Sequence, residues 1–210
     1  MSICDINKAT SAIDTEKIIP RAEFRIFGQG IIDIVKAAMW KSQVTLCGTR
    51  QSGETYILSR HNNSANVKIR DGLLDIKIKV DETDAEYEIY QPGGKFQFPV
   101  QREELAGILE HLKAELILTE EQYSFDAFLE LVASTNDLAG VDVYKERYGF
   151  TMDGVICEYG RVLFNGAMME TACVESEAYD AMEEVITKLE IGGFQNVNYM
   201  KAAKRVVGMQ

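Results

Sequence analysis

The stretch NVKIRDGLLDIKIKV, at positions 66–80, carries the clearest secondary-structure pattern of the sequence. Charged and aliphatic residues alternate on both sides of its centre, which is the period of a β-strand, whose successive side chains point to opposite faces. Asp71-Gly72, at the centre, is a strong signal for a tight hairpin turn. The stretch therefore predicts two antiparallel strands that share one ionic face and one aliphatic face.

The ionic face of this predicted hairpin carries four basic residues, Lys68, Arg70, Lys77 and Lys79. Like charges placed side by side across a hairpin repel, so they lower stability unless acids or a bound anion neutralise them. Two interpretations are open. The face belongs either to a half-solvated sheet with its charges in water, or to a closed barrel with a polar lumen and an aliphatic outer face covered by helices.

Further strands are predicted on both sides of the hairpin by the same alternation and by turn residues between them. They cover residues 21–27, 44–49, 55–60, 87–90, 95–100, 141–150, 154–158, 161–164 and 171–177. The predicted turns lie at Gly53 and at positions 61–64, 92–94, 152–154 and 165–166.

Helices are predicted where apolar residues recur at spacings of three and four. They cover residues 31–41, 101–116, 124–134, 178–190 and 197–207. In the first of these, Trp40 is expected to have apolar neighbours. Runs of strands followed by runs of helices favour an α+β fold with an antiparallel sheet over a doubly wound parallel one.

The composition predicts one folded domain. Of 210 residues, 46% are hydrophobic, which is enough for a sizeable core. Three prolines and the absence of a Gly/Ser-rich linker indicate a single domain over residues 20–210, after a loose polar arm at 1–19. Apolar runs fall short of the roughly 20 residues that cross a bilayer, and no secretory signal pattern is present, so we expect a cytoplasmic protein without a membrane partner.

Charge and cysteine content narrow the function classes. The net charge of −11 disfavours nucleic-acid binding, so any bound anion has to be held locally. Cys4, Cys47, Cys157 and Cys173 lack the spacing of a zinc site or a disulfide framework, and we expect reduced thiols. Cys173 shares strand parity with Glu175 and so could face a common interior, although a buried neutral thiol is the expected state.

Three other predicted strands carry ionic residues at alternate positions. These are Glu23 and Arg25, Lys145 and Arg147, and Glu175 and Glu177. Arg and Lys bind phosphate oxygens, and carboxylates hold Mg²⁺ or Mn²⁺, so a metal-dependent polyphosphate site needs both kinds of side chain. The strands supply this mixture.

Several motifs occur in an order that resembles one family. ETYILSR followed by NVKIRDGLLDIKIK is similar to a Tyr-Tyr, Arg-x-Arg, Lys run, YKERYGF to a Lys-x-Arg strand, TACVESE to a Glu-x-Glu metal strand, and NVNYMKAAKR to a closing helix. In this order they resemble the CYTH family, the triphosphate tunnel metalloenzymes, over about residues 21–204. The family's Glu-x-Glu-x-Lys signature corresponds here to Arg21-Ala-Glu23-Phe-Arg25, which keeps only the middle Glu.

The resemblance implies an antiparallel tunnel of about eight strands with a polar lumen and helices packed outside. It implies that the phosphate chain is bound by Arg25, Lys68, Arg70, Lys77, Lys79, Lys145 and Arg147. It also implies that Mg²⁺ or Mn²⁺ is held by Glu23, Glu158, Glu175 and Glu177.

The activity implied by the resemblance is metal-dependent hydrolysis of inorganic triphosphate or of a nucleoside or thiamine triphosphate. Two alternatives stay open: a class IV adenylate cyclase, which releases pyrophosphate from ATP, and a non-catalytic protein that binds polyphosphate or a nucleotide. The expected partner is thus a small-molecule polyphosphate or nucleoside triphosphate. A homodimer is also left open, because homodimers are common among soluble proteins.

Overall fold

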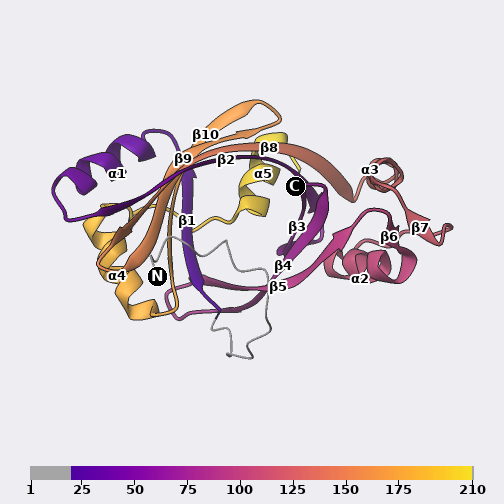
Figure 1. The fold of residues 1–210 in the computed structure, drawn as a ribbon, viewed down its shortest axis with the longest axis horizontal. Coiled ribbons are helices and arrows are strands. Elements are labelled where there is room, and N and C mark those ends of the chain that lie inside the picture. Colours follow the sequence, from indigo (N-terminus) through magenta and orange to yellow (C-terminus); the bar gives the residue numbers. More distant parts are fainter. Residues whose placement is uncertain (1–19, 210) are drawn as a thin grey trace.

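The computed structural model describes residues 20–209, and the predicted arm at 1–19 lies outside them. Eight antiparallel strands close into a barrel in the order β1-β10-β9-β8-β2-β3-β4-β5 (Figure 1). Their bounds are β1 (Ala22–Gly28), β2 (Thr45–Ser59), β3 (Asn62–Arg70), β4 (Leu73–Glu82), β5 (Glu88–Gln97), β8 (Leu138–Met152), β9 (Val155–Phe164) and β10 (Ala167–Ser176). The predicted α+β class with a closed antiparallel sheet is confirmed.

Helices cover the aliphatic outer face of the barrel at two places (Figure 1). The helices are α1 (Ile31–Trp40), α2 (Arg102–Leu112), α3 (Phe125–Ala133) and α4 (Tyr179–Lys188), and β6 (Val100–Gln101) pairs with β7 (Gln122–Tyr123) beside α2 and α3. Phe24 of β1 shares a core cluster with Val35 of α1 and with residues of α4. Val67 of β3 shares a second cluster with Leu105 of α2 and Phe128 of α3. Of the two open interpretations, the barrel with covered outer faces is correct.

The inward face of the barrel changes character along the strands. On β2, Glu54 is followed on the same face by Tyr56 and Leu58, and on β8 Lys145 is preceded by Val143. Tyr56, Leu58 and Val143 belong to a core cluster with α5 (Tyr199–Val207). One part of the interior is therefore an apolar core against α5, and the other part is ionic.

The central hairpin forms as predicted, whereas several predicted turns are wrong. Asp71 and Gly72 join β3 to β4 and both have positive φ. Residues 44–49 and 55–60 instead form the single strand β2, with Gly53 paired to Tyr144. β2 continues through Gly53 because its pairing with β8 runs without interruption from Gly48 to Ser59, whereas its pairing with β3 begins only at Thr55.

Two further strand pairs also merge. Residues 87–90 and 95–100 were expected as separate strands, but β5 runs through positions 92–94, where register shifts against β4 accommodate Pro92. Residues 154–158 and 161–164 belong to β9 alone. A Cβ added to Gly160 would lie 2.1 Å from the Glu146 carbonyl oxygen, so a glycine at this position permits the close approach of β8. Gly160 therefore lies within β9 and does not end a strand.

Two residue-level expectations are wrong. Trp40 is 93% exposed. It is the last residue of α1, and the last buried residue of that helix is Ala38. Cys47 is disulfide-bonded, so the prediction of a reduced thiol is wrong there. The prediction fails because the spacing of cysteines in a sequence does not show which of them the fold brings close together. Cys157 and Cys173 are free and buried, as expected. Over residues 20–209, no helix has the length and apolar content that a bilayer span requires.

Candidate functional site

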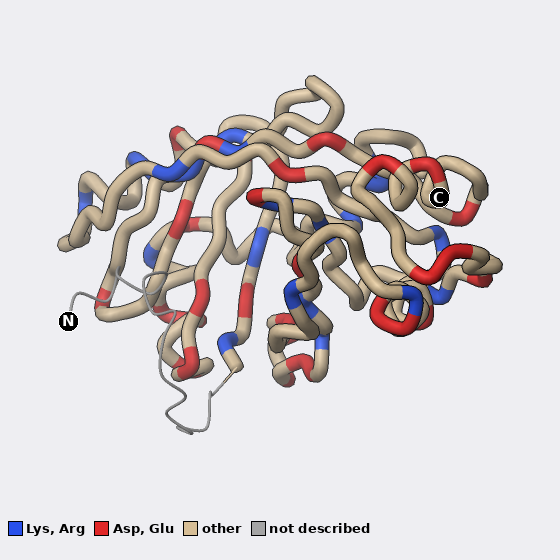
Figure 2. The backbone as a smooth tube through the Cα atoms, turned by 45° about the vertical axis from the view of Figure 1, so that its right-hand side comes forward, with Lys and Arg blue, Asp and Glu red and all other residues tan. Residues whose placement is uncertain are grey.

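The ionic part of the interior encloses a cavity of about 570 Å³, called the chamber below. Nine basic residues line it: Arg21, Arg25, Arg50, Lys68, Arg70, Lys77, Lys95, Lys145 and Arg147. Five acidic residues line it: Glu23, Glu54, Asp75, Glu158 and Glu175. Acidic and basic positions share the same strands along the backbone (Figure 2). The chamber has an excess of basic side chains although the whole chain carries a net charge of −11.

Six of the seven predicted phosphate-binding residues line this chamber, namely Arg25, Lys68, Arg70, Lys77, Lys145 and Arg147. Lys79 is not among the lining residues, and its ammonium pairs with Glu82 and, at 3.6 Å, with Glu88. Basic residues from β1, β3, β4 and β8 thus lie around one cavity. The alternation within each strand predicts this convergence only for a sheet that closes into a barrel.

Three of the four predicted metal ligands, Glu23, Glu158 and Glu175, also line the chamber. Glu177 follows the end of β10, its side chain is 49% exposed, and its carboxylate lies 3.6 Å from Arg21 Nε. The structure therefore brings three of these carboxylates together and leaves Glu177 at the surface.

A buried carboxylate, Glu54, organises one side of the chamber. Lys145 Nζ donates to Glu54 Oε2 at 2.9 Å and to the Tyr56 hydroxyl at 2.8 Å. Lys68 Nζ and Arg70 Nη1 lie 3.7 Å and 3.9 Å from the same carboxylate. The Glu54 side chain is fully buried, so three cations are held around one enclosed anion.

Burial and charge shift the pKa values of this group in opposite directions. Burial alone would raise the pKa of Glu54, but Lys145 and Lys68 hold that pKa at about 2. Burial lowers the pKa of Lys145 well below its usual value, and repulsion from Lys68 lowers it further. Burial also lowers the pKa of Lys68, against the attraction of Glu54. Two lysines therefore lack full compensation by acids, and a bound anion would favour their charged forms.

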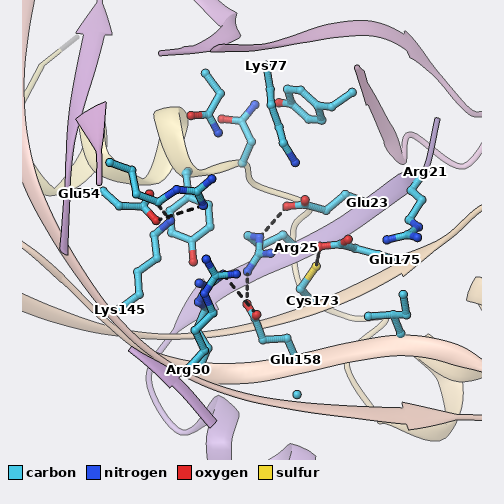
Figure 3. Close-up of a pocket in the computed structure, with 18 of the residues that line it drawn as sticks. Arg21, Glu23, Arg25, Arg50, Glu54, Lys77, Lys145, Glu158, Cys173 and Glu175 are labelled. Carbon is cyan, nitrogen blue, oxygen red and sulfur yellow. Dashed lines mark hydrogen bonds and ion pairs between the residues drawn. The ribbon is translucent and has the colours of Figure 1, made fainter. Parts of the chain in front are cut away.

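A cluster of carboxylates lies on the opposite side of the chamber, with Arg25 among them (Figure 3). Arg25 Nε donates to Glu23 Oε1 at 2.6 Å, Nη1 donates to Glu158 Oε1 at 3.4 Å, and Nη2 lies 3.8 Å from Glu175 Oε1. Glu158 also lies 3.5 Å from Arg147 Nη1. The single guanidinium of Arg25 therefore contacts three carboxylates, those of Glu23, Glu158 and Glu175.

The residues of this cluster fit a divalent metal. Ligand atoms of Glu23, Cys173 and Glu175 lie within 4.8 Å of one another. Burial would raise the pKa of Glu23, but Arg25 lowers it below its usual value. Burial and then repulsion from Glu23 raise the pKa of Glu175. Arg25 alone thus does not neutralise the carboxylates of Glu23 and Glu175, and a bound cation would neutralise the remaining negative charge.

Sequence reasoning missed several residues that line the chamber, among them Glu54 and Tyr199; the others with charged side chains are Arg21, Arg50, Asp75 and Lys95. Glu54 stands two residues before Tyr56, and this parity is a usable signal, but the turn predicted at Gly53 left Glu54 outside the predicted strand at 55–60. Tyr199 lines the chamber from the first position of α5, and Arg25 Cζ lies 4.7 Å from its ring centre. The alternation pattern of strands cannot identify Tyr199, because this residue begins the helix α5 and does not lie in a strand.

Comparison with solved structures finds distant likenesses over most of the chain. A Hippeastrum protein named provisionally as an adenylyl cyclase, and described as having a dominant triphosphatase activity, is 9% identical with a TM-score of 0.48, covering 91% of this chain and 96% of its own. A protein of Pyrococcus horikoshii OT3 is 14% identical with a TM-score of 0.47, covering 85% and 97%. A protein of Bacillus halodurans, provisionally named an adenylate cyclase, is 12% identical with a TM-score of 0.45, covering 87% and 96%.

The sequence matches no family model and no curated protein. The identities are 14% or lower and the TM-scores lie below 0.5, so these three likenesses carry no conclusion about the activity of this chain.

Proposed function

We propose that the chamber binds a small-molecule triphosphate and, with a divalent metal, hydrolyses its terminal phosphate. The observation that carries the proposal is the division of the chamber into two sides, with Glu54 and Lys145 on one and Glu23 and Glu175 on the other (Figure 3). Cations bind phosphate oxygens and carboxylates hold hard metal ions, so a phosphate chain lying between the two sides meets both.

Two chamber cations have donors ready for phosphate oxygens. Lys77 makes no ion pair or hydrogen bond with any described residue. Arg147 has buried Nε and Nη2 atoms without a hydrogen-bond partner within residues 20–209. Burying the two Arg147 donors without acceptors costs free energy, and charge-assisted bonds to phosphate would recover it. Lys77 is exposed, so its ammonium can bind a phosphate oxygen without losing an internal partner.

The other cations act mainly by neutralising charge. Lys68, Lys145 and Arg70 are held in place by Glu54 before a ligand arrives. Donors fixed in an enclosed site stabilise the charge on a transferred phosphoryl group without further reorganisation. A metal held by Glu23 and Glu175 would supply a bound water as nucleophile and a counter-charge for the phosphate.

The proposal is tested by measuring phosphate release from inorganic triphosphate, ATP and thiamine triphosphate, each with Mg²⁺, with Mn²⁺ and with chelator. Release from at least one substrate, dependent on the metal, is expected. Glu175→Gln should reduce turnover more than triphosphate affinity, whereas Glu177→Gln, whose side chain lies outside the chamber, serves as the matched control.

The same assay separates the alternatives. Tight binding without turnover under every metal would contradict hydrolysis and support a binding protein. Formation of cyclic AMP and pyrophosphate from ATP would contradict hydrolysis and support a cyclase. The absence of binding to all three compounds would overturn the proposal as a whole.

A further inference from the structure

One residue of the carboxylate cluster is not a carboxylate. The pairing of β1 with β10 sets Glu23 opposite Glu175 and Arg25 opposite Cys173. Cys173 lies two residues before Glu175 on the same face of β10, and its Sγ is 3.5 Å from Glu175 Oε1. The thiol is only 1% exposed, and it lines the chamber together with both acids.

These three side chains have the arrangement of a metal site with mixed donors. Their ligand atoms, two carboxylate oxygens and one sulfur, all lie within 4.8 Å of one another. The three come from two adjacent strands of a closed barrel, so their backbone positions are fixed by cross-strand hydrogen bonds. A metal at this place would not require the strands to move.

A separate feature of the chamber also indicates a ligand there. Tyr199 is 7% exposed and lines the chamber, and within the described part of the chain its hydroxyl has no hydrogen-bond partner. Its ring lies over Arg25, the residue that contacts Glu23, and the ring centre is 4.1 Å from Lys145 Nζ. A buried hydroxyl normally has a partner, so the Tyr199 hydroxyl is available to a ligand bound in the chamber.

We propose that Glu23, Cys173 and Glu175 bind a divalent metal through two oxygens and one thiolate, and that Cys173 makes the site prefer Zn²⁺, Co²⁺ or Cd²⁺ to Mg²⁺. Mg²⁺ takes oxygen ligands in octahedral geometry, whereas thiolate ligands select softer ions. On binding, a sulfur–metal bond forms and the thiol proton passes to the solvent buffer. This inference deepens the proposed function, because it concerns the metal of the same chamber, but it does not require turnover.

The test is a titration of the protein with Co²⁺ in the absence of any phosphate, followed by absorption spectroscopy. The wild type should show the near-ultraviolet charge-transfer band of a cobalt–thiolate bond. Cys173→Ser should lose the band and bind Co²⁺ at least roughly ten-fold more weakly, since altered metal shells commonly change affinity by such factors. Cys157→Ser, which removes the other buried free thiol, should keep the band. Zn²⁺ should displace Co²⁺, and Mg²⁺ in large excess should not.

A band that persists in Cys173→Ser would overturn the inference, and so would displacement of Co²⁺ by equimolar Mg²⁺. If Cys173→Ser does not fold, zinc-edge X-ray absorption on the wild type decides, because one sulfur ligand is expected and an all-oxygen shell contradicts it. Failure here is distinguishable from failure of the proposed function. A protein without the cobalt–thiolate band that still hydrolyses triphosphate with Mg²⁺ would retain the function and lose only this inference.

Discussion

Glu54 of β2 and Lys145 of β8 form an ion pair inside the barrel, with Nζ 2.9 Å from Oε2. The Glu54 side chain is 0% exposed and that of Lys145 is 3% exposed. Breaking a buried pair by removing one partner typically costs about 3–5 kcal/mol, because the other charge is left uncompensated. The pair therefore fixes the position of a cation in the chamber before a ligand is bound.

Replacement of Glu54 by glutamine should lower stability and tighten anion binding. The substitution keeps the side-chain shape but leaves Lys145, Lys68 and Arg70 without their shared anion. We expect a loss of about 3 kcal/mol in the free energy of unfolding, measured by urea denaturation. Saturating triphosphate should recover much of that loss by binding the same cations.

Glu82→Gln is a suitable comparison, since Glu82 pairs with Lys79 outside the chamber and its side chain is 42% exposed. It should change stability and triphosphate affinity little, as exposed pairs contribute little. Equal stability of Glu54→Gln and the wild type would contradict the structural role given to Glu54.

Acid should destabilise the protein through the same carboxylate. The pKa of Glu54 is lowered from 4.5 to about 2 in the folded state, so its contribution to stability is present above pH 4.5. That contribution is lost as the pH falls from 4.5 to about 2, because the unfolded chain binds the proton first. Unfolding free energies measured across this range should fall more steeply for the wild type than for Glu54→Gln. Parallel slopes would show that Glu54 titrates normally.

Triphosphate binding should take up protons at pH values between the lowered pKa values of the chamber lysines and the usual lysine pKa. Burial lowers the pKa of Lys68 and Lys145 in the free protein, and a bound polyanion raises both again. Between the free and bound pKa values, binding is therefore accompanied by proton uptake, and affinity falls as the pH rises. Calorimetry in two buffers of different ionisation enthalpy measures this uptake.

Lys145→Arg should reduce the proton uptake, since an arginine stays protonated throughout this range. The outcome that contradicts the prediction is a binding heat independent of buffer for the wild type.

Removal of the Lys77 ammonium should weaken triphosphate binding without loss of stability. Lys77 lines the chamber without an ion pair or hydrogen bond among the described residues, so Lys77→Met breaks neither kind of interaction within residues 20–209. A lost charge-assisted hydrogen bond of about 1.5–3 kcal/mol corresponds to a roughly ten-fold or greater loss of affinity. Lys188→Met, which removes a surface lysine paired with Asp153, should leave affinity unchanged. Unchanged affinity in Lys77→Met would remove Lys77 from the site.

Strand alternation predicts which side chains share a face, and this is enough to identify more than half of the charged residues that line the chamber. Lys68, Arg70 and Lys77 could be placed together because Asp71-Gly72 fixes the pairing of their two strands. Alternation could not decide whether this face meets water or an enclosed space, because both leave the same pattern in the sequence.

The remaining features depend on long-range pairing. Glu54 becomes part of the site because β2 lies between β3 and β8, and no local signal records that neighbourhood. The glycines and the proline at positions 53 and 92–94 predict turns, whereas pairing with neighbouring strands holds these positions in the extended strands β2 and β5. Exposure of Trp40 likewise follows from where α1 ends against the barrel.

Binding of triphosphate inside the barrel can be observed in a crystal structure of the protein soaked with inorganic triphosphate. We expect a phosphate chain inside the barrel, with its oxygens within hydrogen-bond distance of Lys77 and Arg147 and its terminal group facing Glu23 and Glu175. Triphosphate bound only on the outer surface, or an interior that stays free of phosphate at saturating concentration, would contradict it.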